Sequence, residues 1–278
     1  MTIKKVGIIL RKDSSEPRLI ADELTTWFGK RSIQVVIDRV DQDLDLLVIL
    51  GGDGTLLHVA DEASRYSIPV VGINLGDLGF LTEVARDERL EALEGILTGS
   101  VTIEKRMMLA VRLCPKGDKS DWCRALNDVV ISKGNIDRLV QLETWADQDY
   151  ITTYRADGLI FSTPTGATAY NLSAGGPIVH PSLNSILVTP ICPFMLDSRP
   201  VLLSHQTRLT TRLIKGGDEN VKIIIDGKAV WDMKEGDVLE VRASDKPLKL
   251  IGSPQNDYFE NLRNKLNWGS SSPKNVKR

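Results

Sequence analysis

The stretch "LLVILGGDGTLLHVA", Leu46–Ala60, joins a run of apolar residues to a glycine-rich turn and the beginning of a helical pattern. A short apolar run bounded by glycines indicates a buried strand. Ligands of open parallel sheets bind beyond the carboxyl ends of the strands, which is where "GGDGT" falls. Glycines let the backbone approach a ligand closely, and amides at a helix start favour an anion. The turn therefore predicts a phosphate-binding loop of Gly51, Gly52, Gly54 and Thr55.

Asp53 is the unexpected group in this turn, because a carboxylate beside phosphates repels them unless it takes a proton from a hydroxyl or faces Mg²⁺. Both uses indicate phosphoryl transfer, with Asp53 as the candidate catalytic residue. A structural alternative stays open, in which the turn only joins a strand to a helix that Asp53 or Thr55 caps. The chain has no GxxxxGK[ST], GxGxxG, HRD or DFG motif, so P-loop and protein-kinase sites are not indicated.

The first hundred residues alternate short strands with helices. The strands are "VGIIL", "QVVID", "LLVIL" and "IPVVGIN", and helical patterns occupy about 17–30, the residues after Thr55 and those from about Asp87. This order predicts a parallel sheet flanked by helices.

From about Val101 the pattern changes to strand-like segments separated by turn residues, among them "TIEKRMMLAVRL", "ALNDVVIS", "LVQLETWAD", "TRLTTRLI", "VKIIIDG" and "DVLEVRAS". Only the closing "NDYFENLRNKLNW" returns to helical spacing, and we expect it to pack on the first domain. We therefore predict an α/β domain of residues 1–100 with about 254–278, and a β-rich domain of residues 101–253.

The segment "YRADGLIFSTPTGATAYNLSAGGPIVHPS", Tyr154–Ser182, is dense in glycines and hydroxyls. Burying this many small polar groups costs free energy unless a ligand or the backbone satisfies their hydrogen bonds. The segment is therefore interpreted as a binding surface. Its hydroxyls, on Thr163, Thr165, Thr168 and Ser173, are suited to phosphate or ribose. Tyr170 is suited to stack on a base, and Asp157 to accept from a ribose hydroxyl. Turns with local hydrogen bonds are the structural alternative.

The other candidate binding residues are single polar side chains, and each is a weaker indication of a site than the two motifs above. Asn127 and Asp128 stand at the head of the strand in "NDVVISKG" and are suited to ribose or adenine, although a capped turn explains them equally. Arg138 and Arg155 are suited to a diphosphate, or to a solvated surface. His58, one turn into the helix after "GGDGT", points back at phosphate or lies on the helix surface.

Composition excludes several classes of protein. The chain has 278 residues, 42% of them hydrophobic, and a formal net charge of -2, so it is globular and has no basic excess for nucleic acid or membrane. Three cysteines without metal spacing (Cys114, Cys123 and Cys192) indicate free thiols and a cytoplasmic location. The three histidines, His58, His180 and His205, are too scattered for zinc. No signal peptide or membrane span is expected.

Taken together, the motifs resemble the NAD kinase family of bacteria. The matching stretches, in family order, are "GGDGTLL", "GINLGDLGFLTEV", "NDVVI", "YRADGLIFSTPTGATAYNLSAGGPIVHP", "TPICP" with "RPVLL", and "IDG" before "GDVLEV". "GGDGT" is shared with lipid kinases and, in related form, with phosphofructokinases. The long glycine-threonine segment favours NAD kinases.

The resemblance implies phosphorylation of the 2′-hydroxyl of the adenosine ribose of NAD. It implies ATP, another nucleoside triphosphate or polyphosphate as donor, and a divalent metal, usually Mg²⁺, whose ligands stay undecided. Asp53 would accept the proton and Gly54 would lie beside NAD. Nucleotide contacts are implied for Asn127, Asp128, Asp157, Thr168, Ala169, Tyr170, Asn171, Leu172 and Ser173, with further polar contacts from His58, Arg138 and Arg155. The family fold is an α/β domain with a β-rich domain and a returning chain end, usually in homodimers or homotetramers.

Three positions depart from the family pattern. Phe194 in "PFMLD" stands where many members have His, Asp128 where many have Glu, and Lys228 where Gln is common.

Two other functions stay open: a lipid or sugar kinase with the same loop, and a dinucleotide sensor without turnover. The chain has no amphipathic basic helix of the kind that docks a lipid kinase on a membrane.

Overall fold

A computed structural model of the protein describes residues 3–12, 15–76, 79–115, 119–134, 138–195, 198–216, 221–252 and 257–266. The chain divides into two compact units. Unit 1 consists of Met1–Leu56, Pro69–Glu104 and Leu250–Arg278, and unit 2 of Leu57–Ile68 and Lys105–Lys249.

The apolar runs near the N-terminus form the first sheet, in the order β2-β1-β3-β4-β19-β6 with β5 paired to β4. Its strands are β1 (Lys5–Leu10), β2 (Gln34–Ile37), β3 (Leu46–Leu50), β4 (Pro69–Asn74), β5 (Val84–Ala85), β6 (Ile103–Arg106) and β19 (Leu248–Ile251). β1 pairs in parallel with β2 and β3, and β4 with β3 and β5. The predicted parallel sheet is confirmed.

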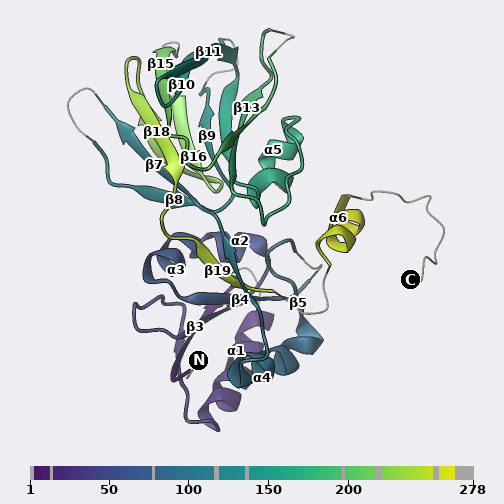
Figure 1. Ribbon diagram of the computed structural model, residues 1–278. Coiled ribbons are helices and arrows are strands. Elements are labelled where there is room, and N and C mark those ends of the chain that lie inside the picture. The colour runs from purple at the N-terminus through teal and green to yellow at the C-terminus, as the bar shows by residue number, and fades with distance from the viewer. Residues whose placement is uncertain are drawn as a thin grey trace, which may run out of the picture. The chain divides into compact units, whose positions relative to one another are not determined.

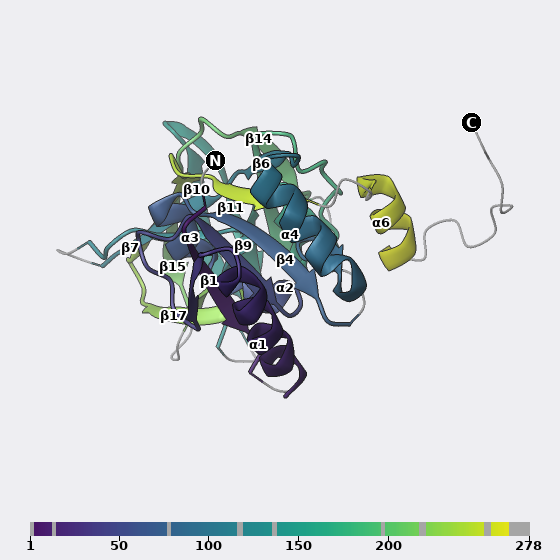
Figure 2. The ribbon, with the colours of Figure 1, turned by 90° about the horizontal axis from the view of Figure 1, so that it is seen from below.

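Two helices cover one face of this sheet. α1 (Glu16–Gly29) and α4 (Arg89–Thr98) share a hydrophobic core with alternate residues of β1, β3 and β4, and Figure 2 shows both helices in front of the strands. A short 3-10 turn, η1 (Arg86–Glu88), leads into α4. α1 begins at the predicted place because Pro17 is favoured in a first helical turn.

The helix predicted after Thr55 is interrupted in the structure. α2 (Asp53–Leu57) already includes Asp53, and α3 (Ala60–Tyr66) follows after a break at His58 and Val59. α3 is held within unit 2, where Ser64 Oγ donates to the carbonyl of Lys246 at 2.7 Å.

The chain returns to the first sheet near its C-terminus. "TIEKRMMLAVRL" divides into β6, which lies in the first sheet, and β7 (Leu109–Cys114), which lies in the second; Met107 and Met108 between them are buried. β19 joins β4 and β6, and α6 (Tyr258–Leu266) belongs to unit 1 and buries Leu262. Residues 254–256 and 267–278 of the predicted returning segment lie outside the described residues.

Unit 2 is built from two six-stranded sheets, in the orders β11-β10-β15-β18-β7-β8 and β14-β13-β12-β9-β16-β17 (Figure 1). The remaining strands are β8 (Cys123–Ala125), β9 (Asp128–Ser132), β10 (Val140–Ala146), β11 (Asp149–Ala156), β12 (Gly158–Ser162), β13 (Ser185–Ile191), β14 (Val201–Ser204), β15 (Leu209–Lys215), β16 (Val221–Ile225), β17 (Lys228–Met233) and β18 (Val238–Ala243). η2 (Gly166–Thr168) and α5 (Tyr170–Ser173) interrupt the strands.

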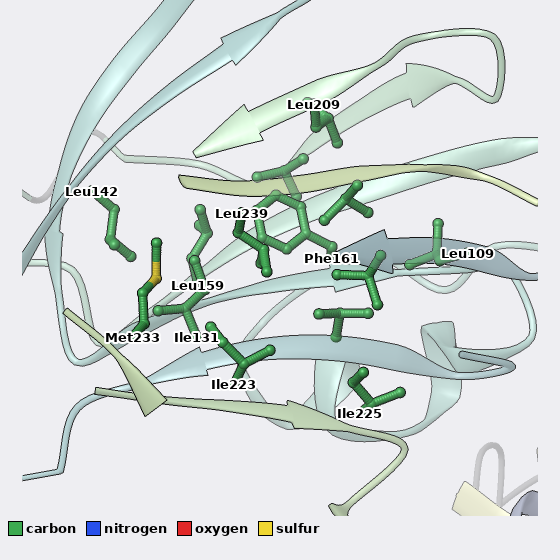
Figure 3. Packing of buried hydrophobic residues seen from close by; sticks show 14 of the residues in the cluster. Leu109, Ile131, Leu142, Leu159, Phe161, Leu209, Ile223, Ile225, Met233 and Leu239 are labelled. Atoms are coloured by element: carbon green, nitrogen blue, oxygen red, sulfur yellow. The ribbon is translucent and has the colours of Figure 1, made fainter. Parts of the chain in front are cut away.

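The core of unit 2 lies between these two sheets. In Figure 3, Leu209 of β15 and Leu239 of β18, from one of these sheets, point toward Phe161 of β12 and Ile223 of β16, from the other. In β15, Leu209, Thr211 and Leu213 are buried and the residues between them are more exposed, because successive side chains of a strand point to opposite faces. The predicted β-rich unit is confirmed.

Candidate active site and nucleotide-binding loops

The carboxylate of Asp53 lies where two neighbouring parallel strands end. β3 leads into the glycine turn and β4 leads toward the segment with Phe80, Leu81 and Thr82, so both strands end at the same edge of the sheet. Asp53 Oδ2 accepts from the Phe80 N–H at 2.9 Å. Asp53 Oδ1 accepts from the Leu81 and Thr82 N–H groups at 3.1 and 3.0 Å, and from Thr82 Oγ1 at 2.9 Å. The carboxylate therefore binds the neighbouring loop and not the amides of its own helix.

Two glycines make room for this arrangement. A Cβ added at Gly79 would overlap Asp53 Oδ1 and lie 2.6 Å from Asp53 Cγ. A Cβ at Gly72 would lie 2.7 Å from the Cα of Thr82. Residues of the "GINLGDLGFLTEV" stretch thus contact Asp53 of "GGDGT". The sequence alone did not predict this contact.

The glycines of the turn differ in what they do. A Cβ at Gly51 would lie 2.6 Å from Thr55 Oγ1, so glycine is required there by the chain's own packing. A Cβ at Gly52 or Gly54 would meet no atom of the described residues within 4 Å. Since α2 is only 5 residues long, its dipole adds little to anion binding, and the open backbone of the turn is the more important feature.

In unit 2, the carboxylate of Asp226 shapes the start of β9. Asp226 Oδ2 accepts from the Leu126 N–H at 2.8 Å, and Oδ1 from the Asn127 and Asp128 N–H groups at 2.8 and 3.1 Å. Asp226 sits in the β16–β17 hairpin with φ of 45°, followed by Gly227 at 81°. Sequence reasoning did not assign Asp226 a role, although an Asp-Gly pair between two strands is a hairpin signal.

Asp128 is buried beside this second carboxylate. Burial and the charge of Asp226 raise the pKa of Asp128 from 3.8 to about 7. Burial also raises the pKa of Asp226, although its three backbone N–H donors oppose the change. Among the described residues, no hydrogen bond reaches the Asp128 carboxylate, so none of them stabilises its charged form by donating to it.

The raised pKa of Asp128 makes stability depend on pH. The unfolded chain releases this proton near pH 3.8 and the folded protein only near pH 7, so folding becomes less favourable as the pH rises between these values. We expect Asp128→Asn to increase the free energy of unfolding above about pH 7, by at most about 4 kcal/mol, and to change it little below pH 4. Urea denaturation at about pH 5 and about pH 8 measures this difference.

Asp232→Asn is the matched control, because that carboxylate is exposed on β17. It should shift stability equally at the two pH values. An Asp128→Asn shift that is also equal at both would contradict the prediction.

The loop after β12 is clamped against the same backbone. Thr163 Oγ1 donates to the Leu126 carbonyl at 2.6 Å, and the Thr163 N–H donates to the Asn127 carbonyl at 2.9 Å. The Gly166 N–H in turn donates to Thr163 Oγ1 at 3.0 Å. Thr163 and Thr165 are buried, so Thr163 supports the loop through its hydroxyl. Asn127 and Asp128 lie at the head of β9, where the strand was predicted to begin.

The segment Thr168–Ser173 presents a mixture of accessible and buried groups. Thr168, Ala169 and Leu172 are half-buried, whereas Tyr170 and Ser173 are exposed. Asn171 has no exposed surface: its Nδ2 donates to the carbonyls of Ala167 and Pro177, and its Oδ1 accepts from Thr189 Oγ1 at 2.7 Å. Asn171 therefore ties α5 to β13.

The charged candidates occupy several places in unit 2. Asp157 is half-buried and paired with Lys133 at 2.5 Å. Arg155 is exposed, with its guanidinium 5.0 Å from the ring centroid of Phe194, and that ring is 65% exposed. The phenyl ring that replaces the usual imidazole thus lies beside a cation. Leu196 and Asp197, quoted with it, lie outside the described residues.

The two remaining candidates, His58 and Arg138, are exposed. Of the other two histidines, His205 is exposed, and His180 is half-buried with its Nδ1 2.7 Å from Ser182 Oγ. The structure thus groups the glycine turn with Asp53 in unit 1, and Asn127 and Asp128 with the Thr163–Gly166 loop in unit 2.

Within the described ranges, no group of three or more His, Cys, Asp or Glu side chains is placed to hold a metal ion, and all three cysteines are free thiols. None of the described helices is long and apolar enough to cross a membrane. A cavity of about 460 Å³ lies against β7, β15 and β18, lined by Arg112, Trp122 and Arg208 among others, and contains none of the predicted site residues.

A parallel sheet with a carboxylate on a "GGDGT" turn, joined to a β-rich unit with a hydroxyl-rich loop, defines a two-domain kinase of small molecules. Residues 12–101 match the ATP-NAD kinase N-terminal domain, and residues 126–253 match the ATP-NAD kinase C-terminal domain. The chain belongs to the NAD kinase family, and it phosphorylates NAD to NADP with ATP. The lipid-kinase and sensor alternatives are not supported.

Individual relatives agree with this assignment. The NAD kinase of Geobacter metallireducens is 42% identical over 283 residues, covering 96% of this chain and 99% of the relative. The NAD kinase of Syntrophotalea carbinolica is 40% identical over 284 residues, with the same coverage. The crystal structure of yeast NADH kinase complexed with NADH has a TM-score of 0.88 and 28% identity, covering 100% of this chain and 91% of the yeast chain.

Proposed function

We propose that Asp53 accepts the proton of the 2′-hydroxyl of the adenosine ribose of NAD. The ribose oxygen forms a bond to the terminal phosphorus of ATP, the bond from that phosphorus to the bridging oxygen breaks, and ADP leaves with its electron pair. The observation that supports this role is the carboxylate held by four donors beside an open glycine turn. A positioned base of this kind is worth about 10²- to 10⁴-fold in rate.

The glycine turn is proposed to hold phosphates. Gly52 and Gly54 leave their backbone accessible, and Gly51 lets Thr55 pack under the turn. Alignment and charge neutralisation are the main sources of rate in phosphoryl transfer, so the turn contributes by fixing the phosphates near the acceptor.

The NAD contacts are proposed to come from accessible groups. Asn127 and Asp128 meet a ribose or adenine edge, and Tyr170 offers an exposed ring for stacking. The other proposed contacts are Gly54, His58, Arg138, Arg155, Asp157, Thr168, Ala169, Leu172 and Ser173. Asn171 is proposed to act by holding α5, because its amide is already engaged inside unit 2.

A divalent metal, Mg²⁺, is proposed to arrive with the ATP phosphates. Asp53 Oδ1 already accepts from three donors, so Asp53 offers at most one oxygen, Oδ2, to a metal ion. This fits a Mg²⁺ ion that is held mainly by phosphates and water. When bound, the ion neutralises charge on the phosphates. Other nucleoside triphosphates and polyphosphate are alternative donors that a direct assay decides.

The protein is proposed to work in the cytoplasm as a homodimer or homotetramer, with small-molecule nucleotides as its partners. Exposed apolar side chains of unit 2, Leu183, Phe194, Met195 and Leu202, support self-association. The domain division at residues 1–100 with 254–278, and 101–253, is retained as a proposal. Light scattering after gel filtration measures the oligomer.

The test is NADP⁺ formation by the purified protein from NAD⁺, ATP and Mg²⁺, with parallel reactions that contain NADH, polyphosphate or no metal. We expect turnover that requires the metal and is lost in Asp53→Asn. Saturable NAD binding in Asp53→Asn with wild-type turnover would overturn the role of Asp53, without changing the family assignment.

A further inference from the structure

Two buried polar side chains, Asn74 and Thr82, form a series of hydrogen bonds that ends on the Asp53 carboxylate. Asn74 Oδ1 accepts from the Gly76 N–H at 2.9 Å, which orients the amide so that Nδ2 faces Thr82. Asn74 Nδ2 donates to Thr82 Oγ1 at 2.8 Å. Because an amide NH₂ only donates, the Thr82 hydroxyl accepts from Asn74 and its own proton points to Asp53 Oδ1, 2.9 Å away. Thr82 is fully buried and Asn74 is 5% exposed, so water does not compete for these bonds.

The two oxygens of the Asp53 carboxylate accept different numbers of hydrogen bonds. Oδ1 receives three donors, from the Leu81 N–H, the Thr82 N–H and the Thr82 hydroxyl. Oδ2 receives one donor, the Phe80 N–H. A carboxylate oxygen has about two lone-pair directions, so Oδ1 is saturated and Oδ2 retains one acceptor direction.

We propose that Thr82, oriented by Asn74, is a positioning residue that occupies Asp53 Oδ1 and presents Oδ2 to the ribose hydroxyl. This inference rests on the proposed role of Asp53 as proton acceptor. It adds the identity of the reacting oxygen and the side chains that select it.

The surrounding backbone is shaped for this arrangement. Gly72, on β4, packs against Thr82, and Gly79 leaves the volume that Asp53 Oδ1 and Cγ occupy. Side chains at either position would displace the hydroxyl or the carboxylate. β4 and the segment after it therefore fit the carboxylate through the side chains of Asn74 and Thr82 and through the absence of side chains at Gly72 and Gly79.

Thr82→Val tests the hydroxyl, because valine keeps the shape and removes the donor. We expect kcat for NADP⁺ formation to fall about 10- to 100-fold with the KM for NAD little changed, as for loss of a hydrogen bond to a charged group. Thr82→Ser should restore most of kcat, because serine keeps the hydroxyl that donates to Asp53 Oδ1.

A double variant separates positioning from folding. In Asp53→Asn, Thr82→Val should cause little further loss, because a residue that acts through Asp53 has nothing left to act on. If Thr82→Val does not fold, Asn74→Ala tests the same role, because it removes the side chain that orients the Thr82 hydroxyl. There we expect a smaller fall in kcat, again with the KM for NAD little changed.

Gly79→Ala and Gly95→Ala form a matched pair in unit 1. Gly79→Ala should lose kcat because its Cβ meets the carboxylate, whereas Gly95→Ala on α4, with its nearest neighbour at 3.6 Å, should keep wild-type activity. Wild-type kcat in Thr82→Val, together with an inactive Asp53→Asn, would overturn the positioning role alone. An active Asp53→Asn would instead overturn the proposed proton acceptor.

Discussion

Asp53→Asn is expected to lower kcat for NADP⁺ formation by about 10²- to 10⁴-fold while leaving the binding of NAD close to wild type. The amide oxygen is able to take the place of Oδ1 and keep its three donors. The amide nitrogen then takes the place of Oδ2, where it meets the Phe80 N–H and presents donors to a hydroxyl that needs an acceptor. The variant therefore loses the base but retains most of the local fold.

The measurement is steady-state turnover beside direct NAD binding by calorimetry and a thermal melt. Loss of turnover with unchanged binding supports the proton acceptor. If NAD binding and melting temperature fall together with kcat, the loss reports disruption of the loop at Phe80–Thr82, and the assignment of Asp53 as base fails this test.

Gly166→Ala is the second large expected effect. Its Cβ would overlap the Asn127 carbonyl oxygen and lie 2.6 Å from the Asn127 Cα, and these are backbone atoms that no rotamer change can move. Either the loop that begins at Thr163 or the start of β9 must shift, which breaks the bond from the Thr163 N–H to the Asn127 carbonyl. We expect a loss of about 1–3 kcal/mol in the free energy of unfolding, and a large increase in the KM for NAD.

Gly216→Ala in the same unit is the matched control. Its Cβ would approach only the ends of the Val221 and Leu213 side chains, at 3.0 and 3.2 Å, which can move by a few tenths of an ångström. KM for NAD and urea denaturation of both variants make the comparison. A Gly166→Ala protein with wild-type KM would show that the clamped loop does not contribute to NAD binding.

The local sequence was sufficient for much of the fold. Short apolar runs such as Leu46–Leu50, separated by helical patterns, predicted a parallel sheet, and strand-like segments separated by turn residues, such as Leu209–Lys215, predicted a β-rich unit. Both predictions depend on residues close together in the chain, because period and turn chemistry are local properties. The break between α2 and α3 at His58 was not predicted, because the apolar pattern continues through it.

The candidate site depended more on distant contacts. Asp53 stood out by its position between glycines, and the roles given to it and to the NAD-binding residues remain predictions. Thr82 lies 29 residues beyond Asp53 and Asp226 lies 98 residues beyond Asp128, and neither showed a local pattern that named its partner. Asn171 was selected with its neighbours by motif, whereas the structure shows that its amide is satisfied inside unit 2.

The sequence by itself determined the class of fold, the glycine turn and the single carboxylate within it, because backbone freedom and residue chemistry are properties of the residues themselves. Only the tertiary structure decided which oxygen of Asp53 is occupied, which hydroxyl occupies it and why Gly79 must lack a side chain. Those features follow from strands β3 and β4 ending side by side, and that adjacency is created by packing between segments far apart in the chain.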